Sequence, residues 1–248
     1  PALVEPDRPL VKGHRVAERK TYPPLDDLVV DTGLSARQVE RLVRVGDPVT
    51  FDQRAIRLNE GWISGKAMDN RASVACLTRL LELLRDRRPA WDVLAAATVQ
   101  EEVGLKGGLT VGYHTEADLA VVVDTTWGIG VGVGDDKGFK LGDGPTLMIS
   151  PEAHPALFRM IQNVARELEL KLTPEVAPHT SGTEAQYLRI ARSGIPTAIL
   201  GIPIRNMHTP VEVVAVKDIE RAARIIAGFI GTLDETTLDK LALDEDES

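Results

Sequence analysis

Residues 92–102 read Asp-Val-Leu-Ala-Ala-Ala-Thr-Val-Gln-Glu-Glu, and this stretch decides the fold class of the chain. Residues 92–99 are largely apolar and have the length of one strand. A continuous apolar run of this length is typical of a strand that is buried on both faces, as in a sheet covered by helices on two sides. The stretch therefore predicts a buried strand that ends in two adjacent carboxylates, Glu101 and Glu102.

Two similar runs and several helical patterns surround this stretch. Residues 119–123 and 196–200 are also apolar and of strand length, and the first of them ends in Asp124. Apolar residues follow helical spacing over four further stretches: residues 72–84, 155–168, 183–191 and 217–233. Strands that alternate with helices predict an α/β layered fold with a largely parallel central sheet. Ligands bind at the carboxyl ends of the strands in such sheets, which is where Glu101, Glu102 and Asp124 lie.

Residues up to about 60 have a different character. Several short stretches have the composition of strands: residues 28–31, 49–51 and 55–58. Ser35 stands three residues before Gln38, which is the spacing of a capping box at the start of a helix. We therefore expect residues 1–60 to form small-β material and residues 61–248 to form the main α/β domain.

Composition restricts the possible partners. The 248 residues suffice for one large α/β domain, or for one domain and a fragment, with 43% hydrophobic and 27% charged residues. Aromatic residues make up only 4% and the net charge is −8. We expect no nucleic-acid partner, because such proteins use basic surfaces and aromatic stacking platforms.

Cysteine content and hydropathy point to a cellular compartment. The single cysteine, Cys76, allows no disulfide within the chain and lies in a helical apolar pattern, so we expect a buried core thiol instead of a nucleophile. No stretch has the apolar length of a transmembrane helix, and no signal-peptide pattern opens the chain. We therefore expect no membrane partner and a cytoplasmic location.

Four separated positions carry side chains that bind divalent metal ions: Asp69, the pair Glu101 and Glu102, Asp124, and His208. Each one alone has an ordinary explanation, such as a helix N-cap for Asp69, a solvated turn for the carboxylates, or a surface position for the histidine. Together, and all at the boundaries of elements, they predict one hydrolytic metal centre. Carboxylates with one imidazole suit Zn²⁺ or Co²⁺, and a carboxylate oxygen can bridge a pair of such ions.

The adjacent pair Glu101 and Glu102 allows a division of roles. One carboxylate can bind an ion while its neighbour acts as a general base on water, provided that the strand ends irregularly, because successive side chains of a regular strand point to opposite faces. A second polar segment, residues 179–183, leads into a helix N-terminus and suits a carboxylate or carbonyl oxygen.

Three other chemistries receive less support. Residues 129–134 alternate glycine with aliphatic residues, but no helix follows and no lysine is placed as in a phosphate-binding loop. Ser181 lacks the G-x-S-x-G surroundings of a serine nucleophile. Adjacent residues such as Glu101 and Glu102 do not naturally flank a glycosidic bond, as the two carboxyl groups of a glycoside hydrolase do.

Five segments together carry a family signature. They read Gly-Lys-Ala-Met-Asp-Asn-Arg at 65–71, Thr-Val-Gln-Glu-Glu-Val-Gly at 98–104, Val-Asp at 123–124, His-Thr-Ser-Gly-Thr-Glu-Ala at 179–185 and Ile-Arg-Asn-Met-His-Thr-Pro-Val-Glu at 204–212. In order and spacing the chain resembles the tetrahedral (TET) aminopeptidases, from about Leu25 to about Leu233. This family of dinuclear metallopeptidases includes glutamyl aminopeptidases and proteins once labelled endoglucanases.

The resemblance implies a fold and an activity. The fold is a three-layer zinc-peptidase fold with an inserted, small β-barrel-like dimerisation domain, to which residues 1–60 would belong. The implied activity is removal of N-terminal residues from short peptides, with two divalent ions of Zn²⁺ or Co²⁺. Self-association from a dimer to a tetrahedral dodecamer is implied as well, and the peptide between Asp69 and Asn70 would be cis.

The resemblance also implies a role for each candidate residue. Asp69 would bridge the two ions, Glu102 and His208 would hold one of them, and Asp124 would hold the other. Glu101 would be the general base. Five residues would line the substrate pocket: Arg205, His179, Ser181, Gly182 and Thr183.

The chain departs from the family at one point. The family has a further histidine ligand in a His-x-Asp-Glu segment, after an early strand of the peptidase domain, and no such segment is present here. The resemblance therefore places Pro1 inside the inserted domain and leaves out the first peptidase strands. Two interpretations follow. The chain is a weak or inactive assembly subunit that binds one ion much more tightly than the second, or it is part of a longer, active enzyme.

Overall fold

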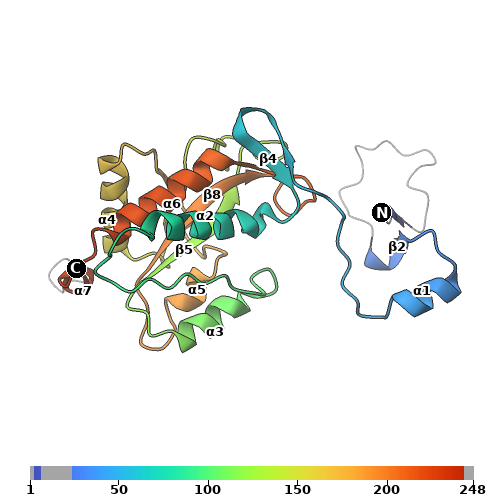
Figure 1. The fold of residues 1–248 in the computed structure, drawn as a ribbon, viewed down its shortest axis with the longest axis horizontal. Coiled ribbons are helices and arrows are strands. Elements are labelled where there is room, and N and C mark those ends of the chain that lie inside the picture. Colours follow the sequence, from blue (N-terminus) through green and yellow to red (C-terminus); the bar gives the residue numbers. More distant parts are fainter. Residues whose placement is uncertain (1–2, 7–23, 243–248) are drawn as a thin grey trace. The chain divides into compact units, whose positions relative to one another are not determined.

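The computed structural model describes residues 3–6 and 24–242 (Figure 1). Contacts within the chain divide it into two compact units, residues 1–53 and residues 54–248. Residues 7–23 of the predicted small-β region and residues 243–248 of the predicted main domain lie outside the described residues. The boundary predicted near residue 60, and the assignment of the first part to a dimerisation domain, stay predictions.

The described residues of the first unit form one strand pairing, one 3-10 helix and one α-helix. Its elements are β1 (Leu3–Pro6), η2 (Leu25–Asp27), β2 (Leu28–Asp31) and α1 (Ala36–Leu42). β1 and β2 pair antiparallel. The backbone N–H of Ser35 donates to Gln38 Oε1 at 3.0 Å, so the predicted start of α1 is confirmed. The strand predicted at residues 49–51 is not formed.

The second unit is built on a mixed sheet. In spatial order its strands are β3 (Ile56–Arg57), β4 (Trp62–Gly65), β9 (Glu212–Ala215), β8 (Thr197–Arg205), β6 (Thr146–Ile149) and β7 (Thr173–Val176), and β5 (Ala120–Trp127) pairs with β8. β5 is parallel to β8 and β6 is parallel to β7, whereas the other described pairings are antiparallel. The predicted α/β class is confirmed, but the sheet is mixed instead of largely parallel. One reason is the short connection from β8 to β9, since strands joined by a tight turn pair antiparallel.

Helices cover both faces of this sheet (Figure 1). The long helices α2 (Met68–Leu84), α4 (Pro155–Glu167) and α6 (Val216–Ile230) pack on one face. The short helix α5 (Ala185–Leu188) packs on the other face, with α3 (Lys106–His114) beside it. Two further elements are short: η3 (Asn59–Gly61) and α7 (Thr237–Leu241). Within the described ranges, no helix has the length and apolarity needed to cross a membrane.

The core follows the alternation of side chains along β8. Leu200 and Ile202 belong to the apolar cluster with α2, α4 and α6, whereas Ile199 lies with Ala185 of α5 on the opposite face. Cys76 of α2 is fully buried in the first cluster, as predicted, and burial raises the pKa of its thiol to about 12. The resulting order of layers is helix, sheet, helix.

The stretch at residues 92–99, which predicted a buried strand, is not a strand. Residues 92–98 have no regular secondary structure, Val99 lies in a bend, and the structure records no backbone–backbone hydrogen bond between residues 92–99 and the rest of the described chain. Leu94 and Val99 are each 70% exposed. The prediction is wrong for the described residues, because a strand needs a neighbour whose backbone groups complete the ladder.

The sequence pattern did not predict α3, which contains Gly107, Gly108 and Gly112. Glycine inside a helix costs about 0.5–1 kcal/mol relative to alanine. A Cβ at Gly107 would collide with the backbone of Val99, one at Gly108 with the side chain of Glu184, and one at Gly112 with α5. The glycines therefore lower helix propensity but allow α3 to approach its neighbours closely.

Substitution in the core tests this packing. Leu157 of α4 is fully buried, so Leu157→Ala is expected to lower the free energy of unfolding by about 2–5 kcal/mol, because it leaves a cavity. Urea or thermal unfolding measures the change. The matched control is Leu238→Ala on α7, where the side chain is 47% exposed and the loss should stay below about 1 kcal/mol. Equal losses at the two positions would contradict the described core.

Candidate metal centre

Three of the predicted metal ligands meet at one end of the sheet. Asp69 lies in the first turn of α2, Glu102 lies in a turn before α3, and His208 lies in the turn between β8 and β9. His208 Nε2 is 3.1 Å from Asp69 Oδ2 and 3.5 Å from Glu102 Oε2. One ligand atom from each of the three side chains lies within 4.8 Å of the other two.

This donor set fits a divalent ion. Zinc lies about 2.0–2.2 Å from nitrogen and oxygen ligands, so the ligands of a tetrahedral site are about 3.3–3.6 Å from one another. The two distances measured at His208 Nε2 are close to that spacing. Two carboxylates and one imidazole are also the number and kind of protein ligands found in catalytic zinc sites.

The backbone at the start of α2 is irregular where it presents Asp69. Asp69 and Asn70 leave the helical region, and the peptide between them is cis, as the family resemblance implies. Asn70 Nδ2 donates to Asp124 Oδ1 at 2.6 Å, and the same oxygen accepts the Thr125 N–H at 2.8 Å. Asp124 therefore lies beside the three-residue group without belonging to it. Asn70, for which the sequence predicts no role in the centre, joins Asp124 to the start of α2.

Glu212 holds the two ligand segments together. Its side chain is only 2% exposed; Oε2 accepts the Asp69 N–H at 3.1 Å, and Oε1 accepts the His208 N–H at 2.7 Å. One buried carboxylate thus fixes the backbone of two ligands from distant parts of the chain. The motif at residues 204–212 predicts no role for Glu212, although its position four residues after His208 is a signal in the sequence.

Acidic groups crowd around the centre. Burial raises the pKa of Asp124 to about 8; the hydrogen bond from Thr125 opposes this shift, and the charges of Glu101 and Asp69 add to it. Burial likewise raises the pKa of Glu101 to about 7, with further contributions from Glu102 and Asp69. Neighbouring carboxylates repel one another when they are ionised, and a bound divalent cation would offset that repulsion.

Arg205, predicted to line the substrate pocket, lies at the end of β8, three residues before His208. Its Nε donates to the carbonyl oxygen of Ile129 at 2.6 Å, and its guanidinium lies 4.9 Å from the centre of the Trp62 ring. The half-exposed indole of Trp127 packs edge-on against the His208 ring at 6.3 Å. Arg205 and the two indoles therefore border the turn that carries His208.

The segment at residues 179–183 is fixed by a buried carboxylate. Glu152, which is 4% exposed, accepts the Ser181 N–H at 2.8 Å, and the hydroxyls of Ser181 and Thr183 lie 2.8 Å apart. Thr183 is buried, whereas His179 and Gly182 are exposed. The described contacts tie this segment to Glu152, and the three-residue metal group does not include it.

Two carboxylates and one imidazole come together beside a helix-covered α/β sheet, and such a set of side chains is typical of the zinc sites of metal-dependent hydrolases. Residues 9–225 match the family described as M42 glutamyl aminopeptidase, and the chain belongs to that family. The resemblance that the five sequence segments predict is thereby confirmed.

Similar curated proteins and solved structures agree with this family membership. A lysyl aminopeptidase of Pyrococcus furiosus is 30% identical over 214 residues, which is 84% of this chain and 60% of the relative. A TET aminopeptidase from a marine sediment archaeon of the Thaumarchaeota aligns with a TM-score of 0.86 and 26% identity, over 97% of this chain and 69% of that one. The TET1 peptidase of Pyrococcus horikoshii, which can assemble into a tetrahedron or a large octahedral shell, aligns with a TM-score of 0.74 and 28% identity, over 90% of this chain and 67% of that one. The chain spans 60% to 64% of the length of the first curated relatives.

Substitution of Glu212 tests whether its carboxylate positions the ligands. Glu212→Gln replaces one acceptor oxygen by an NH₂ group that faces a backbone N–H, so zinc affinity should fall about 10–100-fold. Competition with a chromophoric chelator measures the affinity. Glu167→Gln, at an exposed position of α4, is the matched control and should leave the affinity unchanged. His208→Ala removes a ligand and should cause a larger loss than Glu212→Gln; the opposite order would contradict these assignments.

Proposed function

We propose that this chain carries the catalytic site of a metal-dependent aminopeptidase, which hydrolyses the N-terminal peptide bond of short peptides. The observation that carries the proposal is the meeting of Asp69, Glu102 and His208 at one point, with the carboxylate Glu101 beside them. Membership of the M42 glutamyl aminopeptidase family supports the reaction class.

Metal binding, proton transfer and positioning of the ligands are assigned to different residues. Asp69, Glu102 and His208 would hold a divalent ion, which when bound supplies Lewis-acid polarisation of the scissile carbonyl and of the attacking water. Glu101 lies outside the three-residue group, so its carboxylate is available as a general base. Glu101 accepts a proton from the attacking water and passes it to the leaving amine, and Glu212 keeps the ligands in place.

A second ion belongs to the proposed complete site. Asp69 would bridge two ions of Zn²⁺ or Co²⁺, and Asp124 would hold the second one. In the described chain the second position has only these two carboxylates, and one Asp124 oxygen already accepts two hydrogen bonds. The chain is therefore expected to bind one ion much more tightly than the other.

The substrate pocket follows from the same placement. Arg205 and the segment containing His179, Ser181, Gly182 and Thr183 would line it, with Arg205 at the end of β8 close to the turn of His208. The family description names glutamyl substrates and the Pyrococcus furiosus relative is named for lysyl substrates. These names imply opposite charges, so no preferred N-terminal residue is assigned.

Self-association is part of the proposal. The first unit exposes large apolar side chains, among them Leu42 at 69%, Val49 at 68% and Phe51 at 57%. Apolar surface of this kind is typical of interaction sites. Residues 1–60 would serve as a dimerisation domain, and dimers would build a tetrahedral dodecamer that admits short peptides.

A non-catalytic assembly subunit is the second candidate function. The observation that favours it is the small number of ligands on the Asp124 side of the centre. Such a subunit would form oligomers yet release no amino acids from peptides when Zn²⁺ or Co²⁺ is supplied. Size-exclusion chromatography combined with an aminopeptidase assay separates the two functions.

Substitution of the general base tests the catalytic proposal. Glu101→Gln keeps the size of the side chain but cannot accept the proton, so the release of N-terminal amino acids should fall at least about 100-fold, while affinity for the tightly bound ion changes little. Glu102→Gln should reduce both. Activity that survives Glu101→Gln would exclude Glu101 as the base.

A further inference from the structure

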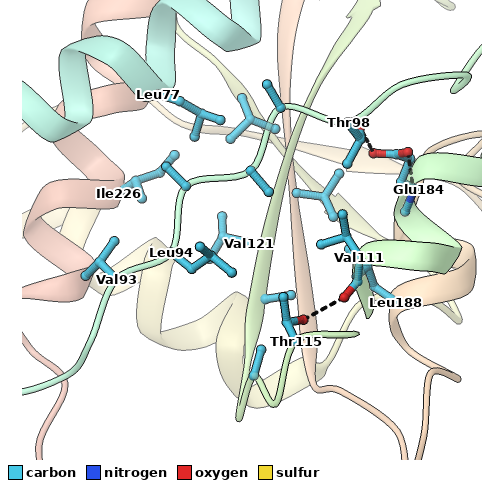
Figure 2. A pocket seen from close by; sticks show the side chains of 18 of the residues that line it. Leu77, Val93, Leu94, Thr98, Val111, Thr115, Val121, Glu184, Leu188 and Ile226 are labelled. Carbon is cyan, nitrogen blue, oxygen red and sulfur yellow. Dashed lines mark hydrogen bonds between the residues drawn. The ribbon is translucent and has the colours of Figure 1, made fainter. Parts of the chain in front are cut away.

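The carboxylate of Glu184 joins three segments of the second unit. Its Oε2 accepts the Thr98 hydroxyl at 2.5 Å, and its Oε1 accepts the Gly108 N–H at 2.5 Å (Figure 2). Glu184 stands directly before α5, whose first residue, Ala185, is fully buried against the sheet. Both carboxylate oxygens are therefore bound by segments from a different part of the chain.

The two bound residues lie at the two ends of one turn. Residues 99–107 connect Thr98 to Gly108, and they contain both Glu101 and Glu102. One carboxylate therefore holds the chain immediately before this turn and immediately after it. A group that binds both ends of a turn restricts the positions of the side chains between them.

The turn itself has little other backbone support among the described residues. Its recorded backbone hydrogen bonds are internal, since the Glu101 carbonyl accepts the N–H groups of Gly104 and Leu105. The Gln100 carbonyl likewise accepts the Lys106 N–H. Gln100 also has a φ of 61°, a left-handed conformation that a residue other than glycine keeps only where the surrounding structure fixes it. Contacts at the ends of the turn are therefore needed to fix it.

Close packing brings α3 and Glu184 against the same segment. A Cβ at Gly107 would collide with the Val99 backbone, and one at Gly108 would collide with the Glu184 side chain. The two glycines thus allow the first turn of α3 to lie directly against the attached residues. Burial raises the pKa of Glu101 to about 7, and Glu184 is among the charges that add to this shift, which agrees with its position near the turn.

We propose that Glu184 is a positioning residue of the metal centre, which clamps both ends of the turn so that it presents Glu102 to the ion and Glu101 to the attacking water. The inference rests on the proposed function, which gives Glu101 and Glu102 these roles. Glu184 does not belong to the three-residue metal group, so it acts through Thr98 and Gly108 and not on the ion.

Two carboxylates then share the support of the centre. Glu212 holds the backbone of Asp69 and His208, and Glu184 holds the turn that carries Glu102. Glu184 also follows the proposed substrate-lining segment directly in the chain. The clamp therefore joins that segment to the turn that carries the proposed general base.

Zinc affinity tests the clamp. Thr98→Val removes the hydroxyl and nearly keeps the shape of the side chain, so zinc affinity should fall about tenfold, as it does when a group that orients a ligand is lost. Thr98→Ser keeps a hydroxyl and should stay within about threefold of the parent chain. The matched control is Thr110→Val, which removes a hydroxyl of α3 that donates to the Gly107 carbonyl and should leave zinc affinity unchanged.

Competition with a chromophoric chelator measures these affinities in the 248-residue chain, once thermal unfolding has shown that each variant is folded. An unchanged zinc affinity in folded Thr98→Val would overturn the proposal. An equal loss in Thr98→Val and Thr110→Val would overturn it as well, because a general effect of lost hydroxyls would then explain both.

A double-mutant cycle separates positioning from a general loss of stability. Glu184→Met removes both acceptor oxygens at similar side-chain length, so zinc affinity should fall at least about tenfold. The double variant of Thr98→Val and Glu184→Met should bind zinc within about threefold of Glu184→Met alone, because both changes remove the same hydrogen bond. Losses that multiply in the double variant would show that the two residues act independently and would contradict the clamp. If Glu184→Met does not fold, the comparison of Thr98→Val with Thr98→Ser decides.

Hydrogen exchange distinguishes a failure of this inference from a failure of the proposed function. Thr98→Val should speed amide exchange at least about tenfold in residues 101–106, with no change in α4. In peptide hydrolysis at saturating zinc, the same variant should lower kcat and leave KM nearly unchanged. If the parent chain binds no zinc and releases no amino acids, the proposed function fails, while exchange still shows whether the clamp holds the turn. A parent chain that binds zinc, with a Thr98→Val variant whose exchange and zinc affinity are unchanged, would overturn the clamp alone.

Discussion

The parallel pairing of β5 with β8 is the constraint on which the rest of the structure depends. Eight consecutive residues pair, from Ala120 with Thr197 to Trp127 with Ile204. The prediction that the strand ends in Asp124 is wrong, because β5 continues to Trp127 and Asp124 pairs with Gly201 inside it. Because the strands are parallel, the carboxyl-terminal half of β5 and the turn that follows β8 lie toward the same edge of the sheet. β9 then returns antiparallel to β8, and its first residue, Glu212, reaches the backbone of Asp69, which is 143 residues away in the chain. Strand pairing therefore brings the residues of the candidate metal centre together without any bound ion.

Much of the candidate site could be predicted from the sequence. Carboxylates at element boundaries placed Asp69, Glu102 and His208 in one centre, and the structure brings these three together. This works because the three residues lie in short polar motifs, in turns or at the start of a helix, which are recognisable in the sequence without knowledge of the sheet. The role of Glu212 could not be predicted from the sequence, because its carboxylate accepts hydrogen bonds from backbone N–H groups. Such bonds depend on which residues meet in the folded chain and not on residue type.

The fold was predictable in class but not in detail. The apolar run at 92–99 is typical of a buried strand, yet a strand exists only where a partner completes its hydrogen bonds, and composition does not report the partner. β6 and β9 are only four residues long and follow irregular loops, so the pattern of apolar and polar residues does not predict them. The mixed sheet has the same origin, since strand direction depends on connections that the pattern of single segments does not reveal.

Hydrogen bonds support one end of the segment that carries Glu101 and Glu102, but not the residues that precede it. Its end is fixed, because the Glu101 carbonyl accepts the N–H groups of Gly104 and Leu105, and the Thr98 hydroxyl donates to Glu184. The preceding residues have no comparable backbone support among the described residues. The most acidic part of the centre therefore depends on a turn and one side-chain contact, whereas Asp69 and His208 share the support of Glu212.

The close approach of α3 has a consequence for anyone who redesigns this protein. Replacement of helix glycines by alanine is a standard route to higher thermal stability, since it reduces the entropy of the unfolded chain. At Gly107 and Gly108 the added methyl group would meet the Val99 backbone and the Glu184 side chain. Glu184 also accepts hydrogen bonds from Gly108 and Thr98, so a displaced α3 would disturb the attachment of the segment that carries Glu101 and Glu102. Glycine-to-alanine substitutions that stabilise this chain are therefore to be sought outside α3.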